Sequence, residues 1–257
     1  MKIAIAGKGG SGKTTTAGTL ARFFARQGYP VLAIDGDSNP NLGITLGISA
    51  EKLNEVDALP SALLHEVEEE DGNGHSVLRS SVEEIAEAVK SLDRKSIHHG
   101  GHRRSCRAHA SVLSIIGAQP AAADTVIVTD MEAGIEHLSR STTRHSDVML
   151  VVTEPYYRSL ETAARIKKMS AELGIPNVYV VANKVRTDQE ADALKKFCAQ
   201  HDLEIIATIP YDEKVAESSL FPAAPLDYCP QTPGVTAVAQ LAQTLQVRAK
   251  ANNASAY

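Results

Sequence analysis

Gly7-Lys8-Gly9-Gly10-Ser11-Gly12-Lys13-Thr14 is the stretch of sequence that decides the fold. It matches the Walker A pattern, which is a glycine, four further residues and then Gly-Lys-Thr. An apolar run at residues 2–6 precedes it, and residues 14–26 follow with apolar side chains at helical spacing. The order strand, loop, helix lets successive backbone N–H groups converge on phosphate, aided by the positive end of the helix dipole. The sequence therefore predicts a nucleotide phosphate site at this loop.

Further apolar runs are rich in Val and Ile without polar alternation, as is typical of strands buried on both faces. These runs are residues 31–34, 125–128, 148–152, 178–181 and 205–209. Helical patterns follow at about 158–173 and 188–200, and a last helix is expected at about 234–249. The alternation predicts a doubly wound α/β fold with a mainly parallel sheet of about seven strands. At this length we expect one domain over residues 1–257.

Residues 51–110 break the alternation, and we expect them to form an insert within the domain. The insert holds charged segments with helical patterns, an acidic run at 66–71, a Gly72-Asn73-Gly74 turn and a histidine-rich stretch. We expect the specialised role of the chain to reside there.

Composition narrows the class of protein. The 257 residues are 43% hydrophobic and carry a formal net charge of -5, so the chain has no overall attraction for nucleic acid. No run approaches about 18 uncharged apolar residues, and Met1 leads directly into a strand-like segment rather than a signal peptide. Three cysteines do not suggest a disulfide framework. We expect a cytoplasmic protein with no membrane partner and no nucleic-acid partner.

The loop itself supplies most of the expected ligands of the nucleotide phosphates. These residues are Gly9, Gly10, Ser11, Gly12, Lys13, Thr14 and Thr15. Lys13 should neutralise the β- and γ-phosphates, and the hydroxyl of Thr14 should hold Mg²⁺.

Lys8 is unusual, because a second lysine at the front of the motif marks the deviant Walker A ATPases, which this sequence resembles. The resemblance implies ATP and Mg²⁺ as ligands and a homodimer in which Lys8 contacts the nucleotide phosphates of the partner. A cation supplied in this way resembles an arginine finger, which contributes on the order of 10³ to 10⁵ in rate. The alternative interpretation is an ordinary exposed loop lysine.

Two acidic segments resemble the remaining catalytic parts of that family. Asp35-Gly36-Asp37 follows a buried strand as switch I does, and the resemblance gives Asp37 the task of orienting or deprotonating the attacking water and influencing Mg²⁺. Asp35 has a second interpretation as an acceptor of hydrogen bonds from loop amides. Asp130 ends a strand that resembles Walker B and would hold a magnesium-bound water. The alternative for Asp37 and Asp130 is helix capping or turn formation.

Gly134 lies in a segment that resembles switch II. The resemblance implies that its backbone N–H donates to the γ-phosphate. Hydrolysis would remove this acceptor and so release the switch II segment.

The base should meet residues that follow two later strands. Asn183 matches the family position that hydrogen-bonds adenine. The segment Ile209-Pro210-Tyr211-Asp212, with Pro210 and Tyr211 at its centre, would give a second wall. The Asn183-Lys184 pair lacks the aspartate that usually selects guanine, so ATP is favoured over GTP.

Residues 129–140, together with 37–42 and 209–217, resemble the maturation ATPases of carbon monoxide dehydrogenase. The resemblance implies that the chain assists nickel insertion into a client metalloenzyme. That family carries a Cys-x-Cys pair, whereas residues 102–109 here contain only Cys106. Two copies of Cys106 and two imidazoles across a twofold axis would supply four ligands suited to Ni²⁺ or Zn²⁺. The imidazoles would come from His109, or from His98, His99 or His102.

Arginines 103, 104 and 107 oppose such a site, because their charges repel a cation. Two alternatives therefore stay open. The loop is a solvated basic segment with a solitary cysteine, or the chain is a partition-type or positioning-type ATPase that acts on DNA or a protein without a transition metal.

Overall fold

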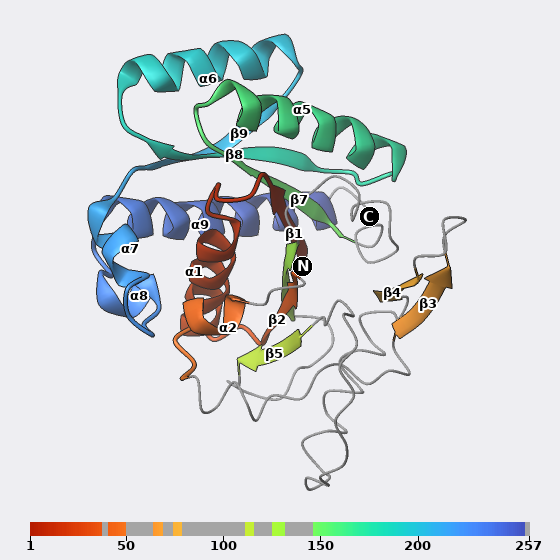
Figure 1. The fold of residues 1–257 in the computed structure, drawn as a ribbon, viewed down its shortest axis with the longest axis vertical. Coiled ribbons are helices and arrows are strands. Elements are labelled where there is room, and N and C mark those ends of the chain that lie inside the picture. The colour runs from red at the N-terminus through yellow and green to blue at the C-terminus, as the bar shows by residue number, and fades with distance from the viewer. Residues whose placement is uncertain are drawn as a thin grey trace, which may run out of the picture.

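The computed structural model describes residues 1–37, 41–49, 64–68, 74–78, 111–115, 125–131 and 146–254. At its centre lies a seven-stranded sheet in the order β5-β2-β6-β1-β7-β8-β9, which confirms the predicted fold class (Figure 1). All neighbouring strands in this sheet pair in parallel except β5, which is antiparallel to β2. The strands are β1 (Lys2–Gly7), β2 (Val31–Gly36), β5 (Ser111–Ile115), β6 (Val126–Met131), β7 (Val148–Thr153), β8 (Val178–Val185) and β9 (Glu204–Pro210).

Helices cover both faces of the sheet (Figure 1). They are α1 (Lys13–Arg26), α2 (Leu42–Thr45), α5 (Tyr157–Glu172), α6 (Asp188–Gln200), α7 (Glu213–Ser218), α8 (Pro225–Tyr228) and α9 (Pro233–Ala254). The α5 and α6 helices lie on one face, and α1 and α9 lie on the other with the short helices beside them. No helix of the described residues is long and apolar enough to span a membrane.

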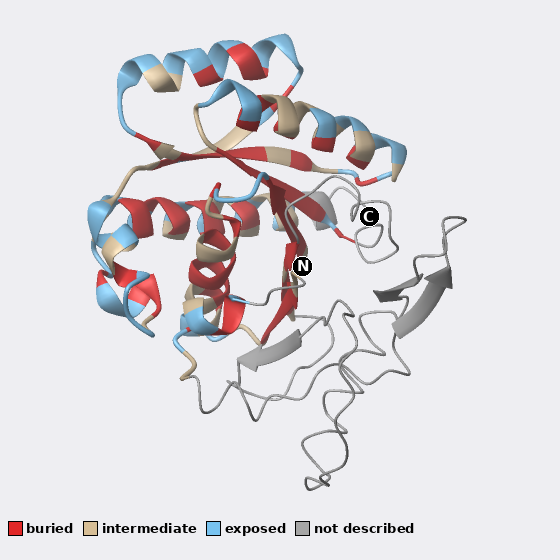
Figure 2. Ribbon diagram, viewed as in Figure 1, coloured by how far each residue is buried: buried red, intermediate tan, exposed pale blue. Residues whose placement is uncertain are grey.

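The two core layers arise from the alternation of side chains along each strand. Ile3 and Ile5 of β1 pack in a cluster with Leu20 of α1 and with residues of α9, whereas the intervening Ala4 packs with Leu160 of α5 and other residues of the opposite layer. The strands β1, β2, β6, β7 and β8 are buried almost throughout (Figure 2), which explains their unbroken apolar sequences. In β9, at the edge of the sheet, only Ile209 is buried.

The insert differs from the expectation of helical segments. Its described residues form an antiparallel pair, β3 (Leu64–Glu68) and β4 (Gly74–Leu78), in a sheet of their own. The charges of this segment favoured helices, whereas Gly72-Asn73-Gly74, which leads into β4, is a sequence of the type found in hairpin connections. The β5 strand was also not expected. It adds an antiparallel edge to the sheet immediately after residue 110, and the rest of the insert lies outside the described residues.

Candidate functional site

The phosphate loop, residues 8–12, connects β1 to α1. The chain passes so close to β7 and β8 that only glycine fits at two positions, the last residue of β1 and the last residue of the loop. Gly7 has φ +149°, and a Cβ there would lie 2.2 Å from the carbonyl oxygen of Val152. Gly12 has φ +95°, and a Cβ there would lie 2.2 Å from Nδ2 of Asn183. Glycine alone tolerates such backbone conformations and approaches readily. The glycines of the motif therefore shape the loop against the ends of two parallel strands.

The two lysines of the loop lie in different surroundings. Lys13 is the first residue of α1, is only 6% exposed and lines a cavity of about 420 Å³. Thr14 and Thr15 line the same cavity from the first turn of the helix. Lys8, at the front of the loop, is exposed. The structure thus places Lys13 at the cavity and Lys8 at the surface, and the contact of Lys13 with phosphate stays a prediction.

Asp35 and Asp130 lie side by side on β2 and β6, where the parallel register pairs them directly. Both are buried. The Asp35 carboxylate accepts hydrogen bonds from the backbone N–H groups of Asp37, Asn41 and Leu42 at 3.1, 2.9 and 2.8 Å. This confirms its interpretation as an acceptor for loop amides. Asp35 anchors both ends of the segment that contains Asp37, and burial raises its pKa against the effect of these bonds.

Asp130 is buried with fewer hydrogen bonds than Asp35. It is 1% exposed, and its Oδ1 atom has no hydrogen-bond partner among the described residues. Burial raises its pKa to about 7, although the Thr14 hydroxyl donates to the carboxylate and the nearby charge of Lys13 acts in the opposite direction. The hydrogen bond from Thr14 and the charge of Lys13 therefore offset only part of the cost of burying this carboxylate.

The residues present fit a magnesium ion. Mg²⁺ binds oxygen ligands and takes only one or two from protein, with the rest from water and nucleotide phosphates. The unpartnered oxygen of Asp130 and the adjoining hydroxyl of Thr14 offer such a set. Within the described part of the chain, no group of three or more His, Cys, Asp or Glu side chains could enclose a metal by itself.

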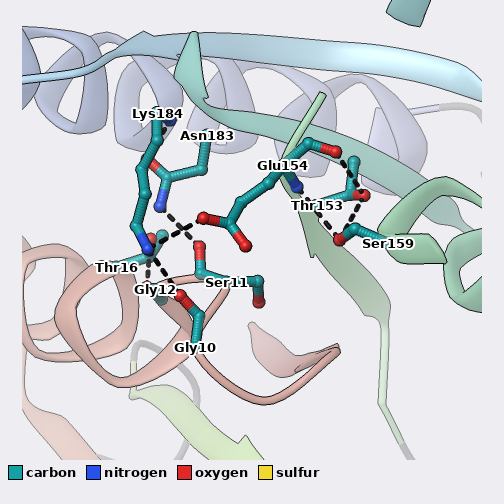
Figure 3. Close-up of polar contacts among 9 residues, drawn as sticks. All are labelled: Gly10, Ser11, Gly12, Thr16, Thr153, Glu154, Ser159, Asn183 and Lys184. Carbon is teal, nitrogen blue, oxygen red and sulfur yellow. Dashed lines mark hydrogen bonds and ion pairs between the residues drawn. The ribbon is translucent and has the colours of Figure 1, made fainter. Parts of the chain in front are cut away.

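The cavity continues from the phosphate loop toward the ends of β8 and β9, where a base would be expected. Asn183, Pro210 and Tyr211 line it as predicted, together with Val215, Pro225 and Val235. Asn183 is 7% exposed, and its Nδ2 atom donates to the carbonyl oxygen of Ser11 at 2.7 Å (Figure 3). Asn183 therefore supports the phosphate loop, and its contact with adenine stays a prediction.

Asp212, the last residue of the segment expected to form the second wall, has a structural role that the sequence did not reveal. Its carboxylate caps α7 by accepting the N–H groups of Lys214 and Val215, and it also accepts the N–H of Gly234 in the first turn of α9 at 2.9 Å. Burial works to raise the pKa of Asp212, but these bonds and one from the Thr232 hydroxyl outweigh it and lower the pKa. One side chain thus holds two helix N-termini beside the cavity.

Lys184 and Glu154 also lie at the site without having been assigned a role there. The ammonium of Lys184 contacts the carbonyl oxygen of Gly10 and lies 3.0 Å from Oε1 of Glu154 (Figure 3). In the sequence, Lys184 contributes only to the choice between ATP and GTP, because no guanine-selecting aspartate accompanies the Asn183-Lys184 pair. Glu154 had no sequence signal, because its partner is 30 residues away.

Three predicted site residues lie outside the described residues: Gly134, Cys106 and His109. Asp37 ends the described part of its segment, and Gly9, Gly10 and Ser11 lie in the loop as predicted.

Comparisons with known proteins agree with this site. The family model CbiA, described as the CobQ/CobB/MinD/ParA nucleotide binding domain, matches residues 2–224. The chain is 36% identical over 233 residues to an uncharacterized ATP-binding protein of Methanocaldococcus jannaschii, covering 85% of this chain and 88% of the relative. It is 34% identical over 228 residues to the carbon monoxide dehydrogenase accessory protein CooC of Rhodospirillum rubrum, covering 84% and 85%.

Among solved structures, the MinD cell division protein of Aquifex aeolicus has the same fold, with a TM-score of 0.63 at 20% identity over 95% of this chain and 96% of that chain. The family match spans the phosphate loop, both buried aspartates and Asn183. The chain therefore belongs to the CobQ/CobB/MinD/ParA family of P-loop ATP-binding proteins.

Proposed function

We propose that the chain hydrolyses ATP and that binding and hydrolysis close and reopen a homodimer. The observation that carries the proposal is the different burial of two lysines in one loop. Lys13 lines the cavity within its own subunit, so the exposed Lys8 is available to a second subunit. Its position at the front of the Walker A motif matches the deviant ATPases in which this lysine acts across the interface.

The proposed chemistry uses few groups. Lys13 and the N-terminus of α1 hold the phosphates, and Asp37 orients the attacking water or accepts its proton. Asp130 and Thr14 hold Mg²⁺, which when bound neutralises negative charge on the phosphate oxygens. Lys8 of the partner adds a positive charge as the dimer closes. Such charges accelerate phosphoryl transfer because they stabilise the transition state more than the bound ground state.

A light-scattering measurement tests the proposal. The Asp37→Ala variant should bind ATP without hydrolysing it, so it should run as a dimer with ATP and as a lighter or more open species with ADP. Wild type should hydrolyse ATP and return to the lighter form. A protein that stays monomeric under all these conditions would contradict the proposed dimer. Equal hydrolysis by wild type and Asp37→Ala would show that Asp37 is not catalytic.

We propose further that the client is a metalloenzyme under maturation. The support is the 34% identity to a carbon monoxide dehydrogenase accessory protein over most of both chains, together with the resemblance at residues 129–140. Ni²⁺ or Zn²⁺ bound by Cys106 and His109 of two subunits would be the cargo. Because residues 102–109 hold one cysteine in place of the Cys-x-Cys pair, the removal of Cys106 alone tests this metal site.

Equilibrium dialysis with Ni²⁺ and Zn²⁺ tests the cargo site. Wild type should bind one ion per dimer, Cys106→Ser should lose it, and the control Cys229→Ser should retain it because Cys229 is buried. Binding that survives Cys106→Ser, or no binding at all, would leave the alternative of a switch that acts on DNA or a protein partner. A gel shift with DNA at physiological salt then separates those two cases.

A further inference from the structure

Two consecutive residues at the end of β8 reach the same loop, which a regular strand does not allow. Adjacent side chains of a strand point to opposite faces. Here Asn183 bonds the carbonyl oxygen of Ser11, and Lys184 bonds that of Gly10 (Figure 3). The pairing of β8 with β9 is irregular between Ala182 and Val185, and Lys184 has φ +59°. The irregularity and the left-handed residue together direct both side chains toward the phosphate loop.

The left-handed conformation of Lys184 stores backbone strain, because a non-glycine side chain is crowded there. Such residues occur more often at functional sites than elsewhere. Lys184 is 38% exposed and Glu154 is 17% exposed, so their ion pair is only partly open to solvent. Because Lys184 lines the nucleotide cavity, the strain is placed where a ligand would bind.

The two carbonyl contacts control the direction of loop N–H groups. In a planar trans peptide the C=O and the following N–H point in opposite directions. The bond from Asn183 to the Ser11 oxygen therefore directs the N–H of Gly12 away from β8. The peptide between Gly10 and Ser11 is held at both ends, because Lys184 contacts its oxygen and its N–H donates to the Lys8 oxygen at 3.1 Å.

Glu154 completes this arrangement. Its Oε1 atom lies 3.0 Å from the Lys184 ammonium, and its own N–H donates to the hydroxyl of Ser159 at 3.1 Å. Ser159 is buried in α5 and also accepts from the Thr153 hydroxyl at 2.9 Å. The backbone of Glu154 is thus attached to the start of α5, and its carboxylate pairs with the flexible lysine from there.

We propose that Glu154 and Lys184 are a positioning pair that fixes the phosphate loop in its binding shape before nucleotide arrives. Neither residue needs to touch the nucleotide, because Glu154 acts through Lys184 and Lys184 acts through the peptide of Gly10. A glycine-rich loop loses much conformational freedom when it binds phosphate, and a loop already held in shape loses less. This role of the pair rests on the proposed function, because the loop that it positions is the one that would hold ATP for hydrolysis.

Calorimetric titration with ADP tests the pair, using Glu154→Gln, Lys184→Met and the double variant. Each single change should weaken ADP binding by about 5- to 20-fold, since each removes a charge-assisted contact. The double variant should be no weaker than Lys184→Met, because the two residues act as one unit. The exposed pair Asp192 and Lys195 on α6, 3.3 Å apart, gives the matched control, and its double variant Asp192→Asn/Lys195→Met should bind ADP as wild type does.

Two further readouts separate positioning from general damage to the fold. Adenosine, measured by competition, should lose much less affinity than ADP, and hydrogen exchange of loop residues 9–12 should speed up in the nucleotide-free variants while β1 stays protected. Wild-type ADP affinity in Glu154→Gln would overturn the pair, as would additive effects in the double variant or equal losses for adenosine and ADP. Because ADP binding needs neither hydrolysis nor a dimer, these results remain interpretable if the proposed ATPase cycle fails.

Discussion

The side-chain amide of Asn183 donates to the backbone oxygen of Ser11 across 172 residues of sequence, and the same amide nitrogen leaves no room for a Cβ at Gly12. The end of β8 and the phosphate loop are therefore one structural unit. Asn183 therefore supports the phosphate loop whether or not it also binds a nucleotide base. Substitutions at Gly12 and Asn183 can measure how tightly the two residues pack.

Gly12→Ala should destabilise the protein more than Gly10→Ala. Both glycines have left-handed φ values, +95° and +81°, so both changes introduce backbone strain. Only the new Cβ at residue 12 meets another atom, because nothing lies within 4 Å of a Cβ at Gly10. We expect an additional loss of about 1 to 3 kcal/mol at residue 12, measured by urea unfolding. Adding Asn183→Ala to Gly12→Ala should recover part of it; an unchanged difference would mean that the amide is not the obstacle.

The buried charge of Asp130 predicts how stability depends on pH without nucleotide. The pKa of Asp130 rises from 3.8 to about 7 on folding, so the folded state holds a proton that the unfolded chain releases. The free energy of unfolding should therefore fall as pH rises from about 4 to about 7, by on the order of 1 to 4 kcal/mol.

Asp130→Asn should remove this dependence, since the amide does not titrate in that range, and it should exceed wild type in stability at pH 8 when Mg²⁺ and nucleotide are absent. Denaturant titrations at several pH values check this, with the exposed Asp192→Asn as control. If Asp130→Asn were less stable than wild type at pH 8, the account of an only partly compensated buried charge would be wrong. The same variant should lose the stabilisation that Mg²⁺ adds to ADP binding.

Asp212→Ala should loosen the base side of the cavity. It removes the cap of α7 and the bond to Gly234 in α9, so we expect a loss of about 1 to 3 kcal/mol. Because the pKa of Asp212 is lowered on folding, its contribution is present above pH 3.8 and is lost as pH falls through the folded value.

Thermal unfolding of Asp212→Ala and of the surface control Asp192→Ala, at neutral and at acid pH, measures this contribution. The gap between the two variants should narrow at acid pH. Asp212→Ala should also lower the affinity for adenosine. An unchanged affinity would mean that the bonds of Asp212 to α7 and α9 do not shape the base pocket.

Much of this architecture could be predicted from sequence because its signals are local. The octamer 7–14 fixes a strand, a loop and a helix, and the unbroken Val and Ile runs identify strands that are buried on both faces. Asp35 was correctly interpreted as an acceptor for loop amides, since an aspartate at a strand end lies near such groups.

The remaining features depend on contacts between distant residues. The hold of Lys184 on the phosphate loop requires an irregularity in β8 and a carboxylate directly after the end of β7, and neither leaves a pattern in sequence. Asp212 was assigned to a pocket wall, but its caps become visible only when α7 and α9 begin side by side. The β3 and β4 pair was missed because charge was weighed above the Gly-Asn-Gly turn.

The central claim is that Lys8 acts on the nucleotide of a partner subunit, and mixing two inactive variants tests it most directly. Lys8→Ala keeps Lys13 and Asp37 but supplies no cation to its partner, whereas Asp37→Ala supplies Lys8 but cannot activate water. In a mixed dimer, the Lys8→Ala subunit would receive the Lys8 of the Asp37→Ala subunit, and one complete site would form.

An equal mixture should therefore recover about a quarter of wild-type ATP hydrolysis, because half of the dimers are mixed and each has one active site. Each variant alone should stay inactive, and Lys8→Ala should keep its affinity for ATP. A mixture no more active than its two components, measured under conditions where mixed dimers form, would contradict the claim and make Lys8 a ligand of its own subunit's phosphates.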